Sequence, residues 1–194
     1  MFKRFTISLS FVVLAFWPSH LSAQQKFEKE SRLKEKDIPS NALGYMDALA
    51  AGKKIRWYLE EGIDRTSIEA KFKFNNQKYS VEFDTSGHLE DIEVEMKWDE
   101  LKQSLQDSIG SQLGQDCKKY KIQKVQIQYA GDPSVLLTKL KTGKNADGYT
   151  VRYEAVVKCC NKKNVALYEY LFNDKGEKIS ISQIVFKNSS NLEY

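Results

Sequence analysis

Few side chains in this sequence could do nucleophilic or acid–base chemistry. The 194 residues contain two histidines, and His20 lies in an N-terminal segment that we expect to be removed. A serine or cysteine nucleophile needs a base within hydrogen-bond reach, and histidine is the usual one. His88 follows a turn at residues 84–87 and is best interpreted as a solvated turn residue. The sequence therefore predicts a protein that is not an enzyme and has no catalytic residues.

Carboxylates are the remaining candidates for chemistry. Asp91, Glu93 and Glu95 alternate along a predicted strand, so they share one face of a sheet, and Glu82 is placed to lie across from them. Three like charges in a row could bind a cation or a basic partner. The same face should also carry basic side chains from neighbouring strands: Arg56, Lys71, Lys73 and Lys78. Cross-strand ion pairs on a solvated surface then explain the carboxylates without a ligand.

Motifs for bound cofactors are absent from the sequence. It contains no HExxH and no paired CxxC, so we predict no zinc site and no other metal site. No glycine-rich loop leads from a predicted strand into a helix, which leaves nucleotide binding without support. The net charge of +4 is too small for a dedicated nucleic-acid-binding protein. We therefore predict no cofactor and no nucleic-acid partner.

Three cysteines allow a structural prediction. Cys117 precedes one predicted strand, and Cys159 and Cys160 end the next. If these strands pair antiparallel, the start of one lies beside the end of the other, which brings Cys117 near Cys159 or Cys160. Secretion would permit a disulfide there. The alternative is three reduced thiols, with Cys159 filling part of the core.

The elements that position these residues follow a predicted secretory signal at residues 1–23. It starts with Lys3 and Arg4, continues with an apolar run over residues 7–17, and ends in a small residue, Ala23. The run is too short to cross about 30 Å of hydrocarbon as a helix. We therefore expect a periplasmic or secreted protein that keeps no stable membrane anchor after cleavage.

Hydrophobic periodicity divides the rest of the chain into two similar units. The polar segment 24–37 is expected to be a flexible N-terminal lead. Residues 38–97 contain a helical pattern and then four stretches in which apolar and polar residues alternate, as in antiparallel strands. Residues 98–187 repeat this order with an insertion at 130–147, and 188–194 form a C-terminal tail. The predicted fold class is α+β, with two tandem repeats of one helix packed on a four-stranded antiparallel sheet.

The first unit resembles a known family. A strand with a tryptophan at residues 54–57, Glu-Ala-x-Phe at 69–72 and Tyr-x-Val-x-Phe-Asp-x-x-Gly at 79–87 are similar to the PepSY-like domain, also described as beta-lactamase-inhibitor-like. The second unit departs from this pattern, with Val157 in place of the phenylalanine and Asn173 in place of the aspartate. The resemblance implies a secreted or periplasmic bacterial protein with helices over a sheet, in a family proposed to bind or inhibit other proteins.

The outward face of the second unit is unusually apolar. Four positions that align with charged residues of the first unit are Val156, Val165, Leu167 and Leu171. A solvated sheet face should not have this composition, so something is expected to cover it. Either a partner protein or a second copy docks there, with Tyr129 at the rim, or the insertion folds back over it as a short helix. The apolar residues of the insertion are Val135, Leu136, Leu137 and Leu140.

These observations predict a secreted or periplasmic, non-catalytic binding module. Its partner would be another envelope or extracellular protein, such as a hydrolase, that it inhibits or regulates. The alternative is a small-ligand carrier with an apolar groove between helix and sheet, near Trp57 and Phe72. The sequence identifies neither the partner nor the ligand.

Overall fold

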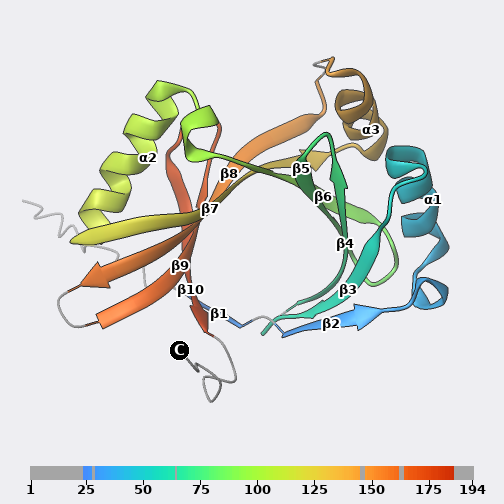
Figure 1. Ribbon diagram of the computed structural model, residues 1–194, viewed down its shortest axis with the longest axis horizontal. Coiled ribbons are helices and arrows are strands. Elements are labelled where there is room, and N and C mark those ends of the chain that lie inside the picture. Colours follow the sequence, from blue (N-terminus) through green and yellow to red (C-terminus); the bar gives the residue numbers. More distant parts are fainter. Residues whose placement is uncertain (1–23, 28, 64, 145–146, 162–163, 186–194) are drawn as a thin grey trace, which may run out of the picture.

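The computed structural model describes residues 24–27, 29–63, 65–144, 147–161 and 164–185, so the predicted signal and C-terminal tail lie outside the described residues. One curved sheet carries helices on its convex side (Figure 1). The helices are α1 (Ser40–Ala50), α2 (Gln103–Asp116) and α3 (Pro133–Thr142). The strands are β1 (Gln24–Phe27), β2 (Lys29–Leu33), β3 (Arg56–Glu61), β4 (Thr66–Phe74), β5 (Gln77–Phe83), β6 (Leu89–Met96), β7 (Lys119–Gly131), β8 (Tyr149–Asn161), β9 (Asn164–Phe172) and β10 (Lys178–Val185).

The sheet is continuous, so the prediction of two repeats with separate four-stranded sheets is wrong. The strands lie in the order β1-β10-β9-β8-β7-β6-β5-β4-β3-β2. β6 and β7 pair antiparallel, with Ile92 opposite Tyr129 and Met96 opposite Val125, and this pairing joins the two predicted units. Two separate sheets would leave the hydrogen-bonding groups of β6 and β7 exposed at their edges, and the pairing satisfies them.

The segment predicted as a flexible lead instead forms two strands at the edges of the sheet. β1 pairs in parallel with β10, and β2 pairs antiparallel with β3. We call residues 24–33 the N-terminal strap, because together they reach both ends of the strand order (Figure 1). Lys26 donates two hydrogen bonds, of 2.6 and 2.7 Å, to the carboxylate of Glu169 on β9. Without the strap, β3 and β10 would be the edge strands of the sheet, with unpaired backbone N–H and C=O groups. The strap pairs with these groups.

Removing the N-terminal strap should destabilise the protein. A mature chain that begins at Lys34 lacks the strand pairing to β3 and β10 and the Lys26–Glu169 ion pair. Because a hydrogen bond contributes a net of about 1 kcal/mol, we expect a loss of roughly 3 kcal/mol in the free energy of unfolding, measured in urea against a chain that begins at Gln24. Equal unfolding midpoints for the two chains would contradict the strap's structural role.

Two apolar cores lie between the helices and the outer face of the sheet. The first is formed by α1 on β3 to β6, and its fully buried members include Ala42, Met46 and Phe83. The second is formed by α2 on β7 to β10; in it Ile109 and Leu113 pack over Tyr170 and Phe172. Each helix presents apolar residues at three- and four-residue spacing, so one stripe of side chains meets the sheet.

The insertion forms a helix, as one alternative proposed, but this helix covers a different surface. Asp132 caps α3 by accepting hydrogen bonds from the backbone N–H groups of Ser134 and Val135, and Gly143 ends it in a left-handed conformation. Leu136 is fully buried in the first core, next to α1. The interpretation that the insertion covers the apolar positions on β8 and β9 is therefore wrong.

A disulfide joins the end of α2 to the sheet. It links Cys117 to Cys159, with 5.4 Å between their Cα atoms, and leaves Cys160 free. The sequence left open Cys117–Cys159 and Cys117–Cys160. The structure contains the first, in which the β8 cysteine is buried. Both bonded residues are buried, with exposed fractions of 2% and 3%.

Candidate functional site

The concave side of the sheet, which we call the inner face, is the strongest candidate for a functional site. Its central side chains are polar and buried: Glu69, Glu93 and Gln126 have exposed fractions of 4%, 7% and 3%. The expectation of a solvated face with surface ion pairs is therefore wrong at its centre. The alternation of residues is as predicted, but the sheet curls into a strongly concave surface (Figure 1), and the side chains at its centre are buried.

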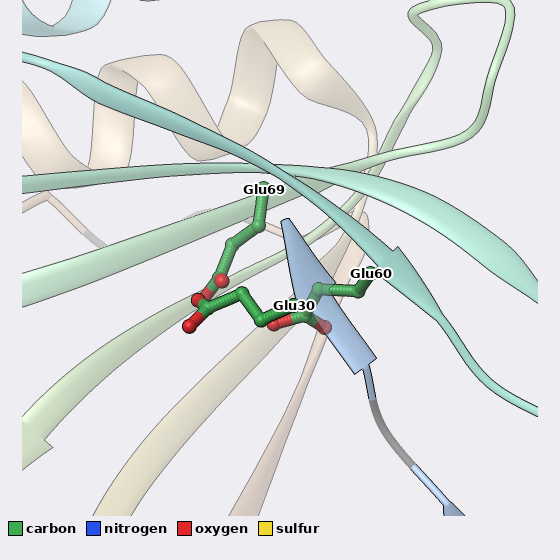
Figure 2. A group of neighbouring side chains, drawn as sticks. All are labelled: Glu30, Glu60 and Glu69. Carbon is green, nitrogen blue, oxygen red and sulfur yellow. The ribbon is translucent and has the colours of Figure 1, made fainter. Parts of the chain in front are cut away.

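Three carboxylates lie close together on the inner face, near the edge at which β2 pairs with β3. Figure 2 shows the side chains of Glu30 on β2, Glu60 on β3 and Glu69 on β4 converging. One oxygen of each lies within 4.8 Å of the others, a spacing that would suit a metal ion. The ammonium group of Lys71 lies among them, 2.7 Å from Glu69 Oε2 and 4.0 Å from Glu60 Oε1, and it donates a hydrogen bond to Glu30. A lysine thus supplies the positive charge that this cluster needs.

The protonation states of this cluster agree with an internal ion pair. Burial by itself would raise the pKa of Glu69, but hydrogen bonds involving Glu60, Lys71 and Ser80 lower it overall. Burial would likewise lower the pKa of Lys71, yet its hydrogen bonds to Glu30 and Glu69 raise it. Both groups of the Lys71–Glu69 pair therefore stay charged at neutral pH, which favours a structural role for the cluster.

A second carboxylate cluster lies further across the inner face. Oxygens of Glu82, Asp91 and Glu93 lie within 4.8 Å of one another. Gln126 donates a hydrogen bond to Glu93, and Gln128 donates one of 3.2 Å to Asp91 Oδ2. Glu93 and Asp91 therefore bond to side-chain amides, and not to the basic residues that were predicted as their partners. We missed both glutamines, although they alternate along β7 with the same period as the acids along β6.

Burial keeps much of this second cluster protonated at neutral pH. It raises the pKa of Asp91 to about 8, with a further contribution from the charges of Glu82 and Glu93. The pKa of Glu93 rises to about 7, again through burial first and then through Glu82. Arg65 moderates the repulsion, since its guanidinium lies 2.5 Å from Glu82 Oε2.

One end of the inner face opens into a pocket of about 420 Å³, which we call the basic pocket. Glu95 lines it and accepts hydrogen bonds of 2.7 and 2.9 Å from Lys78. Phe72 and Tyr79, stacked with their ring centres 4.9 Å apart, also border the pocket, although both pack in the first core. The basic residues of the lining are Lys54, Arg56, Lys71, Lys73, Lys78 and Lys124. Four of them were expected on this face, whereas Lys54, just before β3, and Lys124, on β7, were not among the expected residues.

The predicted partner-binding residues divide between the two faces of the sheet. Val156, Val165, Leu167 and Leu171 alternate with side chains of the second core, so they lie on the inner face. Val165 is the most open of them, with an exposed fraction of 58%. Tyr129 lies on the opposite face, packed against the first core with its ring centre 5.9 Å from that of Tyr149. It therefore does not belong to the rim of this surface.

The predicted ligand groove is present in part. A pocket of about 380 Å³ lies between α1, α3 and the sheet, and its lining includes Leu49, Phe72 and Leu140. Trp57 is not part of this lining: it has an exposed fraction of 4% and its ring centre lies 6.1 Å from that of Phe83 in the first core. Phe72 contributes to both this groove and the basic pocket.

His88 lies at an exposed turn. Its Nδ1 lies 3.1 Å from Asp84 Oδ2, and 71% of the side chain is exposed. The same carboxylate accepts backbone hydrogen bonds from Ser86 and His88, an arrangement that stabilises the turn. A structural role accounts for these contacts.

Solved structures share this fold. A DUF2874 family protein from Bacteroides ovatus aligns with a TM-score of 0.52 and 12% identity, over 75% of this chain and 87% of its own. A candidate periplasmic protein from Bacteroides eggerthii aligns with a TM-score of 0.52 and 14% identity, over 75% of this chain and 88% of its own. At such low identity the likeness shows the fold alone.

A BLIP-like protein from Bacteroides fragilis also aligns, with a TM-score of 0.46 and 14% identity over 75% of this chain and 86% of its own, which is too weak to carry an argument. No family model matches the sequence, and no curated protein matches it. The PepSY-like name therefore gains no support. Among the described helices, none has both the length and the apolar character needed to cross a membrane.

Proposed function

We propose that this protein is a non-catalytic binding module that acts in the periplasm or outside the cell. The observation that carries the proposal is the apolar part of the inner face, which none of the helices in the described part of the chain covers. The expected signal at residues 1–23 and the fold shared with a candidate periplasmic protein support the location. The position of His88, exposed at a turn and paired with the turn residue Asp84, supports the absence of catalysis.

The binding surface that we propose is the inner apolar patch, defined as Val156, Val165, Leu167 and Leu171. In the register of the sheet, Lys124 lies directly opposite Val156, and Lys158 lies directly opposite Leu167. Glu169 and Glu154 lie directly opposite Val156 and Leu171 on the neighbouring strands. Apolar side chains bordered by charges of both signs would fit a protein surface with an apolar centre and a charged rim. The partner would be an envelope or secreted protein, such as a hydrolase that this module inhibits or regulates.

The proposal can be tested with a charge placed in the inner apolar patch. We expect immobilised mature wild type to retain a partner from envelope extract, and the Val165→Asp/Leu167→Asp variant to lose at least about tenfold in affinity, because a buried unpaired carboxylate is costly. Ile63→Asp is the control, since Ile63 is similarly exposed at 61% but lies between β3 and β4. Equal retention of the partner by all three proteins would exclude this surface.

A second candidate function is transport of a small apolar ligand. The pocket between α1, α3 and the sheet favours it, because a volume of 380 Å³ falls within the usual range of ligand sites. Native mass spectrometry of the purified protein should then show a bound mass that Leu140→Arg removes. A protein that purifies without any bound mass and yet retains a partner through the inner apolar patch would favour the binding module.

A further inference from the structure

We infer that the basic pocket binds a small polyvalent anion, meaning a compact ligand with two or more phosphate or carboxylate groups. The inference concerns the end of the inner face formed by β3, β4 and β5, and it does not depend on the proposed protein partner. It rests on three observations: the register of the basic residues, their incomplete neutralisation, and the shape of the pocket.

The register of the sheet places like charges directly opposite one another. Arg56 on β3 faces Lys71 on β4, and Lys73 on β4 faces Lys78 on β5. Like charges in directly opposed positions destabilise a sheet, and here two such pairs follow one another on the same face. A polyvalent anion between these side chains would convert the repulsion into attraction.

The carboxylates around the pocket neutralise only part of this charge. Lys71 pairs with Glu30 and Glu69, and Lys78 pairs with Glu95. Over the described ranges of the chain, no such ion pair to a carboxylate occurs at three other basic residues of the lining, which are Lys54, Arg56 and Lys73. Three positive charges therefore face one pocket without an acidic partner.

The acidic centre of the inner face does not cancel these charges. Lys124 is the member of the lining whose charge acts on Glu93 and Glu154. Burial raises the pKa of Glu93 to about 7 and also raises the pKa of Glu154, so near neutral pH these carboxyl groups carry less negative charge than exposed glutamates would. The mouth of the pocket therefore keeps its positive potential, and a ligand there meets little repulsion from the groups behind it.

The size and walls of the pocket indicate a small ligand. Its volume of about 420 Å³ lies near the lower end of the range for small-molecule sites, which is roughly 300 to 1,000 Å³. Phe72 and Tyr79, which belong to the first core, border the pocket and make part of its lining apolar. Cations on several sides suit charged groups that point in different directions, as in a diphosphate or a tricarboxylate.

Calorimetric titration of the mature protein with pyrophosphate and with citrate tests the inference. We expect saturable binding of at least one anion with a stoichiometry of one, weakened about tenfold or more between about 50 and 500 mM NaCl, because salt screens exposed charges. The stronger of the two ligands distinguishes a phosphate-bearing from a carboxylate-bearing natural ligand. The Arg56→Gln/Lys73→Gln variant should bind about tenfold more weakly or worse.

The control variant is Lys102→Gln/Lys175→Gln, which removes the same charge from exposed positions outside the pocket, and it should bind like wild type. Without ligand, the pocket variant should unfold at the same or a higher temperature than wild type, since it relieves cross-strand repulsion, so weaker binding cannot come from misfolding. The inference fails if neither anion binds saturably, if the pocket variant binds as well as wild type, or if only an acidic peptide such as hexaglutamate binds.

Discussion

Loss of the Cys117–Cys159 disulfide should lower the free energy of unfolding by about 3 to 4 kcal/mol. The bond closes a loop with a sequence separation of 42 residues, so its removal restores conformational freedom mainly to the unfolded chain. It also ties the end of α2, where the Cys117 N–H donates to the Leu113 carbonyl, to β8 beneath the second core. For a chain of this length, the change corresponds to a fall of roughly 6 to 16 °C in melting temperature.

The measurement is thermal unfolding of Cys117→Ala/Cys159→Ala under non-reducing conditions. Cys160→Ala is the matched control, since Cys160 neighbours the bond but is free, and its melting temperature should stay close to that of wild type. Reductant should lower the melting temperature of wild type and leave that of the double variant unchanged. Non-reducing peptide mapping that links Cys117 to no other cysteine would refute the pairing.

The second large effect is expected from the carboxyl groups of the inner face. Asp91→Asn/Glu93→Gln should be more stable than wild type at pH 8, by about 3 kcal/mol, and similar to it near pH 4. Burial, reinforced by Glu82, raises the pKa of Asp91 from 3.8 to about 8 and that of Glu93 from 4.5 to about 7. The folded protein thus holds protons that the unfolded chain releases.

The direction of the pH effect follows from this difference in bound protons. The stability that the protonated pair contributes is fully present only below the unfolded pKa values of 3.8 and 4.5, is still nearly complete at pH 4, and is lost as the pH rises towards 8. The amides cannot ionise, so the stability of the variant should change less over this interval. Urea unfolding at several pH values measures the difference, with Glu35→Gln/Asp99→Asn as the exposed control. Parallel pH profiles for wild type and the Asp91→Asn/Glu93→Gln variant would contradict the explanation.

Both effects concern the stability of the folded sheet. The disulfide holds the second core, while the acidic cluster favours a compact inner face only while it is protonated. The basic pocket adjoins this cluster through Lys124 and Gln126. A ligand bound there would therefore lie beside groups whose charge changes between about pH 7 and pH 8.

The alternation of residues predicted several local features correctly. The α1 segment, with Met46 at its centre, is helical and ends just before Gly52, which has a positive φ angle. Phe83 and the aromatic residues of β9 face the helices, and the acids of β6 face away from them, as the two-residue period requires. These features depend on neighbours in sequence, so a local pattern is sufficient to predict them.

The candidate site itself was only partly accessible to prediction. Arg56, Lys71, Lys73 and Lys78 were placed on one face, and this face does line the basic pocket. We interpreted these four basic residues as ion-pair partners of the acids on the same face. Alternation shows which side chains share a face, but it does not show which of them come into contact. Glu93 in fact bonds to Gln126, 33 residues away, and Lys71 bonds to Glu30 on the strap.

Local sequence patterns are thus sufficient to predict the order and type of most elements, the face on which each strand side chain lies, and the cysteines that can meet. They do not predict that β6 pairs with β7, that α3 packs on the first core, or that the strap reaches both edges of the sheet. The difference lies in the sequence separation of the contacts. The alternation of a strand is set by its own backbone, whereas the arrangement of the strands depends on contacts such as Lys26–Glu169, which join residues 143 positions apart.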